Sequence, residues 1–226
     1  HARGDQHAFA SSLRWAADSM TLLLVPLSAL CVALAVPAMT VLAFGQANDR
    51  QSIELLSVAL ISLGVGMLPY GLFFLWSRAF YVLGDSRSPA LWGAAASSVG
   101  VLVMLVAGAT TSDTTTVFVL GLAHSLSFVL GCVALLVALH RRTGQWVLPR
   151  AFPGSLLLST VGGLVVWAVH EVWSPSGKIG AVVSLAVLVP LFASIYLGGA
   201  RLLGMSVTQR IPGHARSGSS APEGAG

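Results

Sequence analysis

The chain has few charged residues and few cysteines, and each shortage excludes a class of protein. Charged side chains make up 9% of its 226 residues, against about a quarter in a typical soluble domain. The two cysteines, Cys31 and Cys132, lie inside apolar runs. They indicate small buried side chains, neither a disulfide framework nor a metal-binding pair. No signal peptide is visible, and because the chain begins at His1 rather than at Met, we expect further residues before it.

Apolar residues are present in large excess. They make up 55% of the chain, and the mean hydropathy is +0.83. One globular core of this length cannot hold so much apolar surface, so lipid is the expected solvent for most of it. The formal net charge of +4 does not indicate nucleic-acid binding, because the basic residues stand singly between apolar stretches with no stacking aromatics beside them.

Long apolar runs predict the fold class, an all-α integral membrane protein with six transmembrane helices. At 1.5 Å per residue, a run of about 20 residues crosses a hydrocarbon core of about 30 Å. None of the runs shows the period-two alternation of a barrel strand that faces lipid. The expected spans are residues 20–44, 53–83, 89–109, 116–139, 152–173 and 179–203.

The basic residues between these spans orient the helices. Only Arg50 and Lys178 fall on one side of the membrane. Ten of the 12 Lys and Arg residues fall on the other side, namely Arg3, Arg14, Arg78, Arg87, Arg141, Arg142, Arg150, Arg201, Arg210 and Arg216. By the positive-inside rule, both ends of the chain face the cytoplasm. Removing or adding one span would scramble this division, so the division also supports the count of six.

The expected organisation has two flanking segments around two groups of spans. Residues 1–19 predict a cytoplasmic amphipathic connector along the membrane interface. Four spans follow within residues 20–140, and two more lie within residues 151–204. Residues 205–226 are rich in Ser, Gly, Pro and Ala, which predicts a disordered cytoplasmic tail or a linker through which a cytoplasmic partner could bind.

Prolines and small residues predict how the helices bend and pack. Four prolines lie inside the expected spans, namely Pro26, Pro37, Pro69 and Pro190. Each removes a helical hydrogen bond and is expected to kink its helix. Kinks in three helices favour a bundle that bends around a cavity during a transport cycle. Small residues four apart, such as Ala96 with Gly100 and Ser127 with Gly131, predict close contacts between helices.

No arrangement of residues in the sequence indicates an enzyme. We find no nucleophile elbow, no Gly-rich phosphate loop and no metal-ligand spacing of His and Cys, so we expect neither a cofactor nor a metal. His124, inside the fourth span, is an ionisable group in the membrane and therefore a functional candidate. The alternative is a neutral imidazole that bonds to a neighbouring helix. Ser97 and Ser98 are the polar candidates of the third span.

The most specific local string joins the second and third spans on the expected cytoplasmic side. It reads Arg78-Ala79-Phe80-Tyr81-Val82-Leu83-Gly84-Asp85-Ser86-Arg87-Ser88-Pro89. Arg78 can extend toward the lipid headgroups while Phe80 and Tyr81 anchor the membrane interface. Asp85 can pair with either flanking arginine or cap the turn. Pro89 suits the first turn of the next helix, where its missing N–H costs nothing.

The pattern Arg-x-Phe-Tyr-x-x-x-Asp-x-Arg-x-Pro at the end of a long apolar helix resembles the MviN/MurJ family, flippases for the peptidoglycan precursor lipid II. Pro26, Leu34-Ala35-Val36-Pro37 and Phe44-Gly45 also look like parts of the ninth and tenth helices of that fourteen-helix fold. Six spans with both ends cytoplasmic are similar to helices nine to fourteen. The resemblance covers the chain up to about Gly204.

The resemblance implies part of an inner-membrane transporter of the MOP superfamily, which moves lipid II outward by alternating access. The first four spans would belong to the second lobe, and the last two would form a lipid-facing groove for an isoprenoid tail. The implied partners are lipid II, membrane lipids and the missing earlier helices of the same chain. Family members with a sodium site have Asn or Asp in the helix that matches the third span, where this chain offers only Ser97 and Ser98, so a sodium site is not implied.

Three residues of the string are the candidate site on this basis. Arg78, Asp85 and Arg87 are expected to form a cytoplasmic gate or turn lock, with direct contact to the pyrophosphate of lipid II as the alternative. Two other functions stay open. One is an exporter of another lipid-linked oligosaccharide or small molecule in the same superfamily, and the other is a non-transporting membrane scaffold.

Overall fold

The computed structural model describes residues 2–45, 49–111, 113–173 and 177–204, and within these ranges the chain forms helices and no strand. The expected tail, residues 205–226, lies outside the described residues. In chain order the helices are α1 (Ala2–Ala33), α2 (Ala35–Leu42), α3 (Arg50–Gly64), α4 (Met67–Val82), α5 (Arg87–Thr110), α6 (Asp113–Thr143), α7 (Phe152–Trp173) and α8 (Gly177–Leu202).

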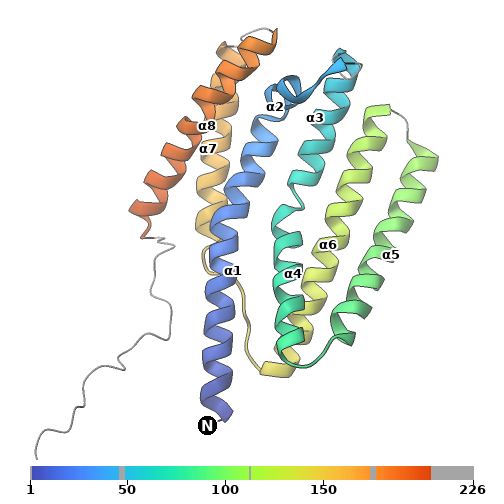
Figure 1. Ribbon diagram of the computed structural model, residues 1–226, viewed down its shortest axis with the longest axis vertical. Coiled ribbons are helices and arrows are strands. Elements are labelled where there is room, and N and C mark those ends of the chain that lie inside the picture. Colours follow the sequence, from blue (N-terminus) through green and yellow to red (C-terminus); the bar gives the residue numbers. More distant parts are fainter. Residues whose placement is uncertain (1, 46–48, 112, 174–176, 205–226) are drawn as a thin grey trace, which may run out of the picture.

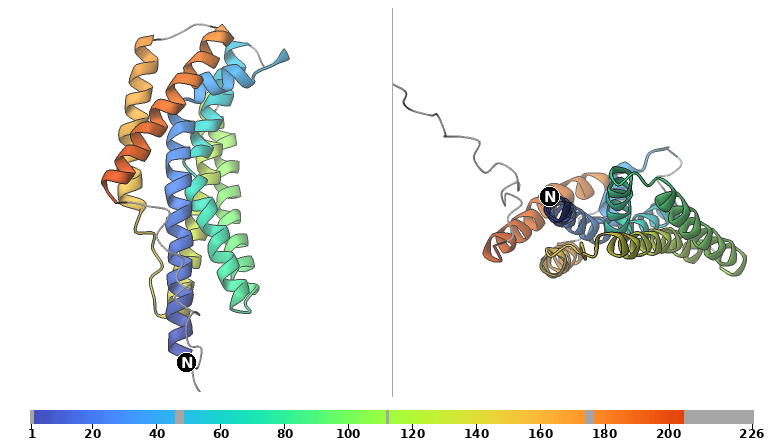
Figure 2. Two further views of the ribbon diagram at one scale, coloured as in Figure 1. Left: turned by 60° about the vertical axis from the view of Figure 1, so that its left-hand side comes forward. Right: turned by 90° about the horizontal axis from the view of Figure 1, so that it is seen from below.

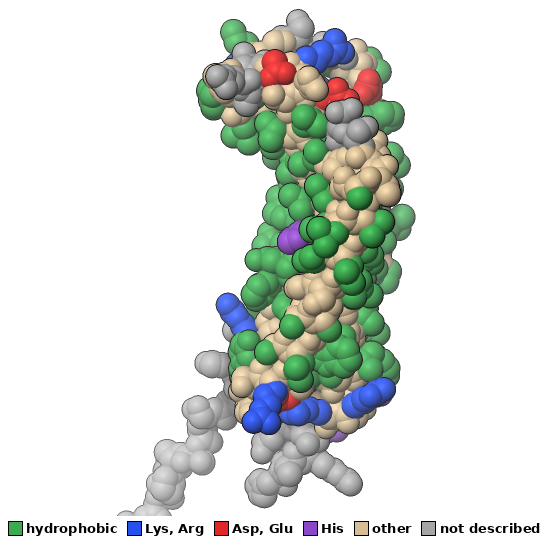
Figure 3. Space-filling view, turned by 90° about the vertical axis from the view of Figure 1, so that its right-hand side faces the viewer, with side chains coloured by type: hydrophobic (Ala, Val, Ile, Leu, Met, Phe, Trp, Pro, Cys, Tyr) green, Lys and Arg blue, Asp and Glu red, His purple; other side chains and the backbone are tan. Residues whose placement is uncertain are grey.

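The helices have the length and surface of membrane spans. In the described part of the chain, five helices are long and apolar enough to cross a membrane, and the bent α3–α4 pair makes a sixth when it is counted as one span. Large apolar side chains such as Leu102, Leu105 and Leu157 are more than half exposed, which only lipid would solvate. Figure 3 shows an apolar band between two ends where charged side chains gather. The all-α membrane fold is therefore confirmed, and the chain is a multi-pass membrane protein.

The first span begins earlier than the sequence predicts. The expected connector, residues 1–19, is not a separate element, because its residues from Ala2 onward form the first half of an unbroken α1. Ala10, Leu13 and Ala17 of this half are buried in a core shared with α4 and α6. Since this face of α1 is covered by protein, the segment continues straight into the span.

Only two of the four prolines stand at helix breaks. Pro37 has no N–H to donate to the Ala33 carbonyl, and α1 ends at Ala33. Pro69 lies in the first turn of α4, directly after the break that bends α3 against α4 by 44°. Pro26 and Pro190 lie inside the continuous helices α1 and α8. The helix breaks therefore lie at Pro37 and Pro69, whereas α1 and α8 continue without a break through Pro26 and Pro190, where the expected kinks stay a prediction.

Helix α1 lies between two groups of helices (Figure 1, Figure 2). On one side it packs against α7, with α8 on α7 and α2; on the other it packs against α3 and α4, which pack on α6. Helix α5 packs on α6 through small residues. A methyl group at Gly100 would stand 2.8 Å from the Ser127 Cβ, and one at Gly131 would stand 3.4 Å from the Ala96 Cβ. The predicted close contacts of these residues are confirmed.

The connections between helices gather at two ends of the bundle (Figure 1). The N-terminal end of α1, the α4–α5 turn and the α6–α7 loop share one end. The α2–α3 connection, with Arg50, and the start of α8, with Lys178, lie at the other. The described basic residues at the first end are Arg14, Arg78, Arg87, Arg141, Arg142 and Arg150. The uneven division of charge is thus a property of the folded chain, and the end that faces the cytoplasm stays a prediction.

Candidate functional site

The turn between α4 and α5 is built around Asp85. Gly84 has a φ of +73°, a left-handed conformation that favours glycine. Its N–H donates to the Tyr81 carbonyl oxygen at 3.0 Å, and the Asp85 N–H donates to that of Phe80 at 2.9 Å. These two bonds close the end of α4 as a Schellman motif. They also place Asp85 directly before the first turn of α5.

The Asp85 carboxylate caps α5. Its Oδ1 accepts the backbone N–H groups of Arg87 and Ser88, each at 3.0 Å, and its Oδ2 accepts the Ser88 hydroxyl at 2.6 Å. These donors have no partner inside the helix, and the helix dipole favours a negative charge beside them. The hydrogen bonds from Ser88, with a smaller contribution from the nearby Arg142 guanidinium, hold the pKa of Asp85 below its usual value.

The ion-pair partner of Asp85 comes from the end of α6. The Arg142 Nη2 lies 2.5 Å from the Asp85 Oδ2, and its guanidinium lies over the Phe80 ring, 5.5 Å from the ring centroid. Of the pairings expected for Asp85, the cap is confirmed and those with Arg78 and Arg87 are wrong; both arginine side chains are exposed. The only sequence signal for Arg142 was its place in a pair of arginines that ends an apolar run.

Phe80 does not anchor the membrane interface as expected. It is fully buried, because the core of α1, α4 and α6 closes around it. Tyr81, which is 57% exposed, does reach the surface. Pro89 lies in the first turn of α5, where the sequence places it, and is buried. The string therefore combines one surface aromatic with a turn that packs into the bundle.

A second set of contacts ties α1 to the α6–α7 loop at the same end. The Arg14 Nη2 donates to the Trp146 carbonyl oxygen at 2.7 Å. The Asp18 Oδ1 accepts the Ala151 N–H at 2.9 Å, immediately before α7 begins. Asp18 and Asp85 thus have the same structural role, because each carboxylate accepts a hydrogen bond from at least one backbone N–H at the start of a helix.

A buried hydrogen-bond cluster joins α1, α7 and α8 inside the membrane-spanning part. The Tyr196 hydroxyl donates to the Leu22 carbonyl oxygen at 3.0 Å, and the Ser155 Oγ lies 2.8 Å from the Tyr196 Oη. Ser155 is fully buried. No pattern in the sequence points to these residues, because a Tyr and a Ser in apolar helices are common and their partner is a backbone atom of a third helix.

An apolar cleft of about 1120 Å³ opens between α7 and the group formed by α1, α4 and α6. Its lining runs along α7 from Phe152 to Trp167. The hydroxyls of Ser28 and Ser159 line it and have no hydrogen-bond partner among the described residues. No described residue of α8 lines this cleft. The apolar cleft therefore lies between α7 and the group of α1, α4 and α6, and the groove expected between the last two spans stays a prediction.

The polar candidates of the third and fourth spans lie apart from the Asp85 turn. His124 is exposed on α6, and its ring meets Phe128 edge-on with centroids 5.0 Å apart. Within the described ranges its imidazole has no hydrogen bond, and the two alternatives for His124 stay predictions. Ser97 and Ser98 are exposed on α5, and the Ser98 hydroxyl donates to the Ala94 carbonyl of its own helix.

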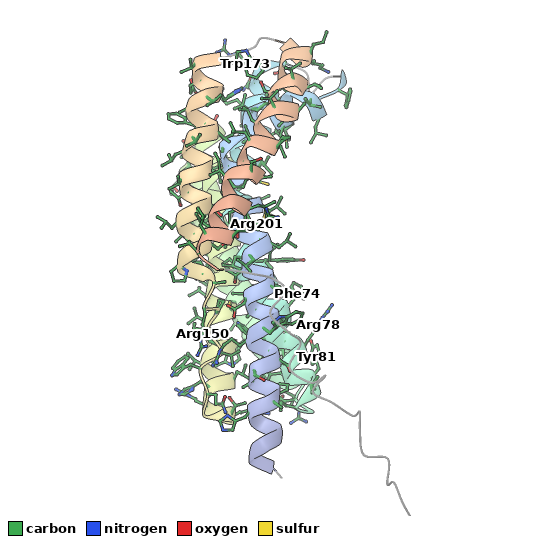
Figure 4. The ribbon with its side chains drawn as sticks, turned by 90° about the vertical axis from the view of Figure 1, so that its left-hand side faces the viewer. Phe74, Arg78, Tyr81, Arg150, Trp173 and Arg201 are labelled. Carbon is green, nitrogen blue, oxygen red and sulfur yellow. The ribbon has the colours of Figure 1, made fainter. Side chains whose placement is uncertain are left out.

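The basic residues do not form one cluster. Figure 4 shows Arg78 on one side of the bundle, near Phe74 and Tyr81, with Arg150 on the opposite side. In the part of the chain that the structure describes, no group of three or more His, Cys, Asp or Glu side chains could hold a metal ion. The arrangement offers a turn held by hydrogen bonds and an ion pair, a separate exposed arginine and an apolar cleft.

Comparison with known proteins assigns these features to a family. No curated protein and no solved structure matches the chain. A family model described as lipid II flippase MurJ matches residues 1–188. The match covers α1 to α7 and the first part of α8, and therefore both the Asp85 turn and the cleft. It names the same family that the string from Arg78 to Pro89 resembles, and the chain belongs to the MurJ family of lipid II flippases.

Proposed function

We propose that this chain is part of a transporter that moves lipid II, or a related undecaprenyl-linked precursor, across the bacterial inner membrane by alternating access. The observation that carries the proposal is the family match over residues 1–188. This match includes every helix that builds the Asp85 turn and the apolar cleft. The earlier helices of the same chain would complete the transporter.

The cleft suits the isoprenoid tail of such a cargo. Its α7 wall runs from Phe152 to Trp167, which is about 23 Å at 1.5 Å per residue. This is most of the roughly 30 Å hydrocarbon thickness of a bilayer. An apolar chain in the cleft would contact protein along most of its path across the membrane while its polar headgroup moves elsewhere.

The Asp85 turn acts in this proposal as a lock that makes α4, α5 and α6 one rigid group. Its hydrogen bonds hold the end of α4 to the start of α5, and the ion pair with Arg142 adds the end of α6. Alternating access needs groups of helices that move as units. The Arg78 side chain takes no part in the lock, which leaves it available to the cargo, and Arg87 contributes only its backbone N–H.

We place both ends of the chain in the cytoplasm, since the Asp85 end carries most of the basic residues. The tail, residues 205–226, would then offer a cytoplasmic partner a binding segment. Single cysteines at Thr111 and Arg141 in intact cells test the placement. A membrane-impermeant thiol reagent should label the Thr111→Cys variant from outside and leave Arg141→Cys unlabelled; the reverse pattern would contradict it.

The cargo is tested with the full-length protein in proteoliposomes that contain lipid II. Protein-dependent movement of lipid II across the bilayer, and slower movement in the Asp85→Ala variant, are the expected results. Arg87→Gln is the matched control for the lock, because it keeps all of the Asp85 side-chain contacts with Ser88 and Arg142. Movement of another lipid-linked oligosaccharide without movement of lipid II would replace the proposal with the exporter alternative, and no movement of either would favour the scaffold.

A further inference from the structure

Two helix breaks adjoin each other in the bundle. The first separates α1 from α2 at Leu34, where Pro37 has no N–H for the Ala33 carbonyl. The second separates α3 from α4 and bends the two helices by 44°. A Cβ at Gly64, the last residue of α3, would stand 3.3 Å from the Cys31 Cβ in the last turn of α1. The two interruptions thus lie at the same level, and α2 and α3 lie beyond them.

Helices α2 and α3 contact each other directly. The Ser57 Oγ of α3 lies 3.4 Å from the Ala35 carbonyl oxygen of α2 and donates to it, and Ser57 is buried. Asp49 caps the start of α3, where its carboxylate accepts the Ser52 N–H at 3.1 Å. The two apolar cores found among the described residues include no side chain of α2 or α3. The pair therefore lies outside both cores, and segments with few buried apolar side chains open more easily than a core.

A close contact with α6 lies at the α3–α4 break itself. The Ser125 hydroxyl of α6 donates to the Ser62 carbonyl oxygen at 2.8 Å, and a Cβ at Gly66 would stand 2.8 Å from the Ser125 Cβ. Gly64 and Gly66 flank Val65 at the break, and glycine accepts a wide range of backbone angles. This point can therefore stay in place while the helices beyond it change their angle.

The far end of α2 is bound by a side chain from the start of α8. The Lys178 Nζ donates to the Ala43 carbonyl oxygen at 2.6 Å and lies 4.7 Å from the centroid of the Phe44 ring. A cation is favoured beside the last carbonyls of a helix and over the face of an aromatic ring. Figure 2 shows the start of α8 beside the end of α2. Because α2 has only eight residues, it is too short to be stable by itself, and this contact supports its end.

We propose that α2 and α3 move as one hinged pair about the two adjacent breaks, and that Lys178 holds this pair to α8 in the present structure. Release of the Lys178 contact would let the far end of α2 separate from α8 while the Ser125 contact is kept. Hinge motions are concentrated in a few residues at the ends of helices. The inference rests on the proposed function, in which the motion would open the Lys178 end of the bundle to the cargo.

A permanent kink is the alternative, because breaks at proline and glycine also occur in rigid membrane helices. Two observations favour the hinge. The breaks adjoin each other in neighbouring helices, so a single motion can use both. Lys178 is exposed, so its ammonium can release the Ala43 carbonyl and stay in water. Both breaks and the Lys178 contact are formed by residues of α1 to α8, and they need no helix that precedes this chain.

Spin-label distances in the full-length protein in liposomes test the motion. In a background without other cysteines, Leu42→Cys and Ile179→Cys carry the labels, since these side chains are 64% and 83% exposed. Lys178→Met should raise the ratio of separated to closed populations roughly two- to fivefold, because it removes the charge from the helix end and from the ring. Lys178→Arg keeps the charge and the donors, so it should leave the ratio at its native value.

A second label pair is the matched control for these distances. Val172→Cys and Ile179→Cys place both labels on α7 and α8, and this distance should be the same in all Lys178 variants. A distance from Leu42 to Ile179 that does not change in Lys178→Met would overturn the inference. A change in both label pairs would overturn it as well, because the start of α8 and not α2 would then be moving.

Cross-linking tests whether cargo movement needs the motion. Phe44→Cys and Lys178→Cys replace two side chains that meet at the far end of α2. A short bifunctional thiol reagent that joins them should abolish lipid II movement in proteoliposomes, and cleavage of the link by a reducing agent should restore it. The same variant treated with a monofunctional reagent is the control and should still move lipid II. Unimpaired movement by the cross-linked protein would contradict the hinge.

The two experiments separate this inference from the proposed function. If lipid II moves while the cross-link and Lys178→Met have no effect, the proposed function stands and the hinge is wrong. If lipid II does not move in any variant while Lys178→Met still lengthens the distance from Leu42 to Ile179, the hinge stands and the proposed cargo is wrong.

Discussion

The Tyr196 hydroxyl donates a 3.0 Å hydrogen bond to the carbonyl oxygen of Leu22. That carbonyl is special because Pro26, four residues further on, has no N–H with which to satisfy it. An unsatisfied carbonyl in the membrane interior costs several kcal/mol in principle. Tyr196 of α8 therefore supplies the hydrogen-bond donor that Pro26 cannot supply to the Leu22 carbonyl. The proline thus creates a hydrogen-bonded contact between α1 and α8.

At the break between α3 and α4, a side chain of a neighbouring helix also bonds to a backbone carbonyl that has no partner within its own helix. The Gly66 N–H donates to the Leu63 carbonyl instead of reaching back to Ser62. The Ser62 carbonyl then accepts the Ser125 hydroxyl of α6 at 2.8 Å. In both places a neighbouring helix completes a backbone that a proline or a bend has interrupted, so the interruption fixes which helices pack together.

The first prediction concerns the Tyr196 hydroxyl. Tyr196→Phe should lower the free energy of unfolding of the full-length protein by about 0.6 to 2 kcal/mol, the range of hydrogen bonds between helices in membranes. Unfolding in detergent micelles by added SDS measures it. Tyr70→Phe is the matched control, since the Tyr70 hydroxyl has no hydrogen bond among the described residues, and it should leave stability within about 0.5 kcal/mol.

A double-mutant cycle shows whether Pro26 is the cause. Pro26→Ala restores a backbone N–H that can bond to the Leu22 carbonyl. That carbonyl then no longer depends on the Tyr196 hydroxyl for a hydrogen bond. The cost of Tyr196→Phe should therefore shrink in the Pro26→Ala background, by at least half of its value in the native protein. An undiminished cost would show that the hydroxyl acts through another contact, such as that with Ser155.

The second prediction ranks the contacts of the Asp85 turn. Asp85→Ala removes both backbone caps and the ion pair, and it should cost about 1 to 2 kcal/mol of stability. Arg142→Gln leaves both backbone caps in place and removes the ion pair and the contact of the guanidinium with the Phe80 ring. Because the arginine side chain is 48% exposed, this substitution should cost less than about 1 kcal/mol. Arg87→Gln should cost nothing measurable. An Arg142→Gln effect equal to that of Asp85→Ala would mean that charge pairing, and not capping, holds the turn.

Local features of this chain could be predicted from the sequence, and partners across the bundle could not. The spans follow from runs of apolar residues, and the Asp85 cap follows from its place before a helix start. Arg142 is 57 residues from Asp85, and nothing in either local sequence selects the other. Tyr196 is 174 residues from Leu22, whose backbone atom carries no sequence signal at all. The sequence left two alternatives open for His124, because exposure depends on how α4 and α6 pack.

The third prediction tests the contact of α6 with the α3–α4 break. A Cβ at Gly121 would overlap the Ser62 Oγ and stand 2.7 Å from its Cβ, whereas a Cβ at Gly108 meets nothing within 4 Å. Gly121→Ala should therefore cost about 1 to 3 kcal/mol through overpacking. Gly108→Ala, the matched helical control, should be neutral or stabilise by up to about 1 kcal/mol. Equal effects of the two substitutions in SDS unfolding would contradict the close contact.

The last prediction is the pH dependence of the Asp85 turn. The pKa of Asp85 is lowered in the folded protein, first by hydrogen bonds from Ser88, relative to about 3.9 in an unfolded chain. A group with a lowered folded pKa stabilises the fold above the unfolded value, and this stability is lost as the pH falls through the folded value. The stability difference between the native protein and Asp85→Asn should therefore be constant from about pH 7 to pH 5 and should shrink below about pH 4. Taking the difference cancels the titration of other groups, and a difference that stayed at full size near pH 2 would mean that the carboxylate charge does not stabilise the turn.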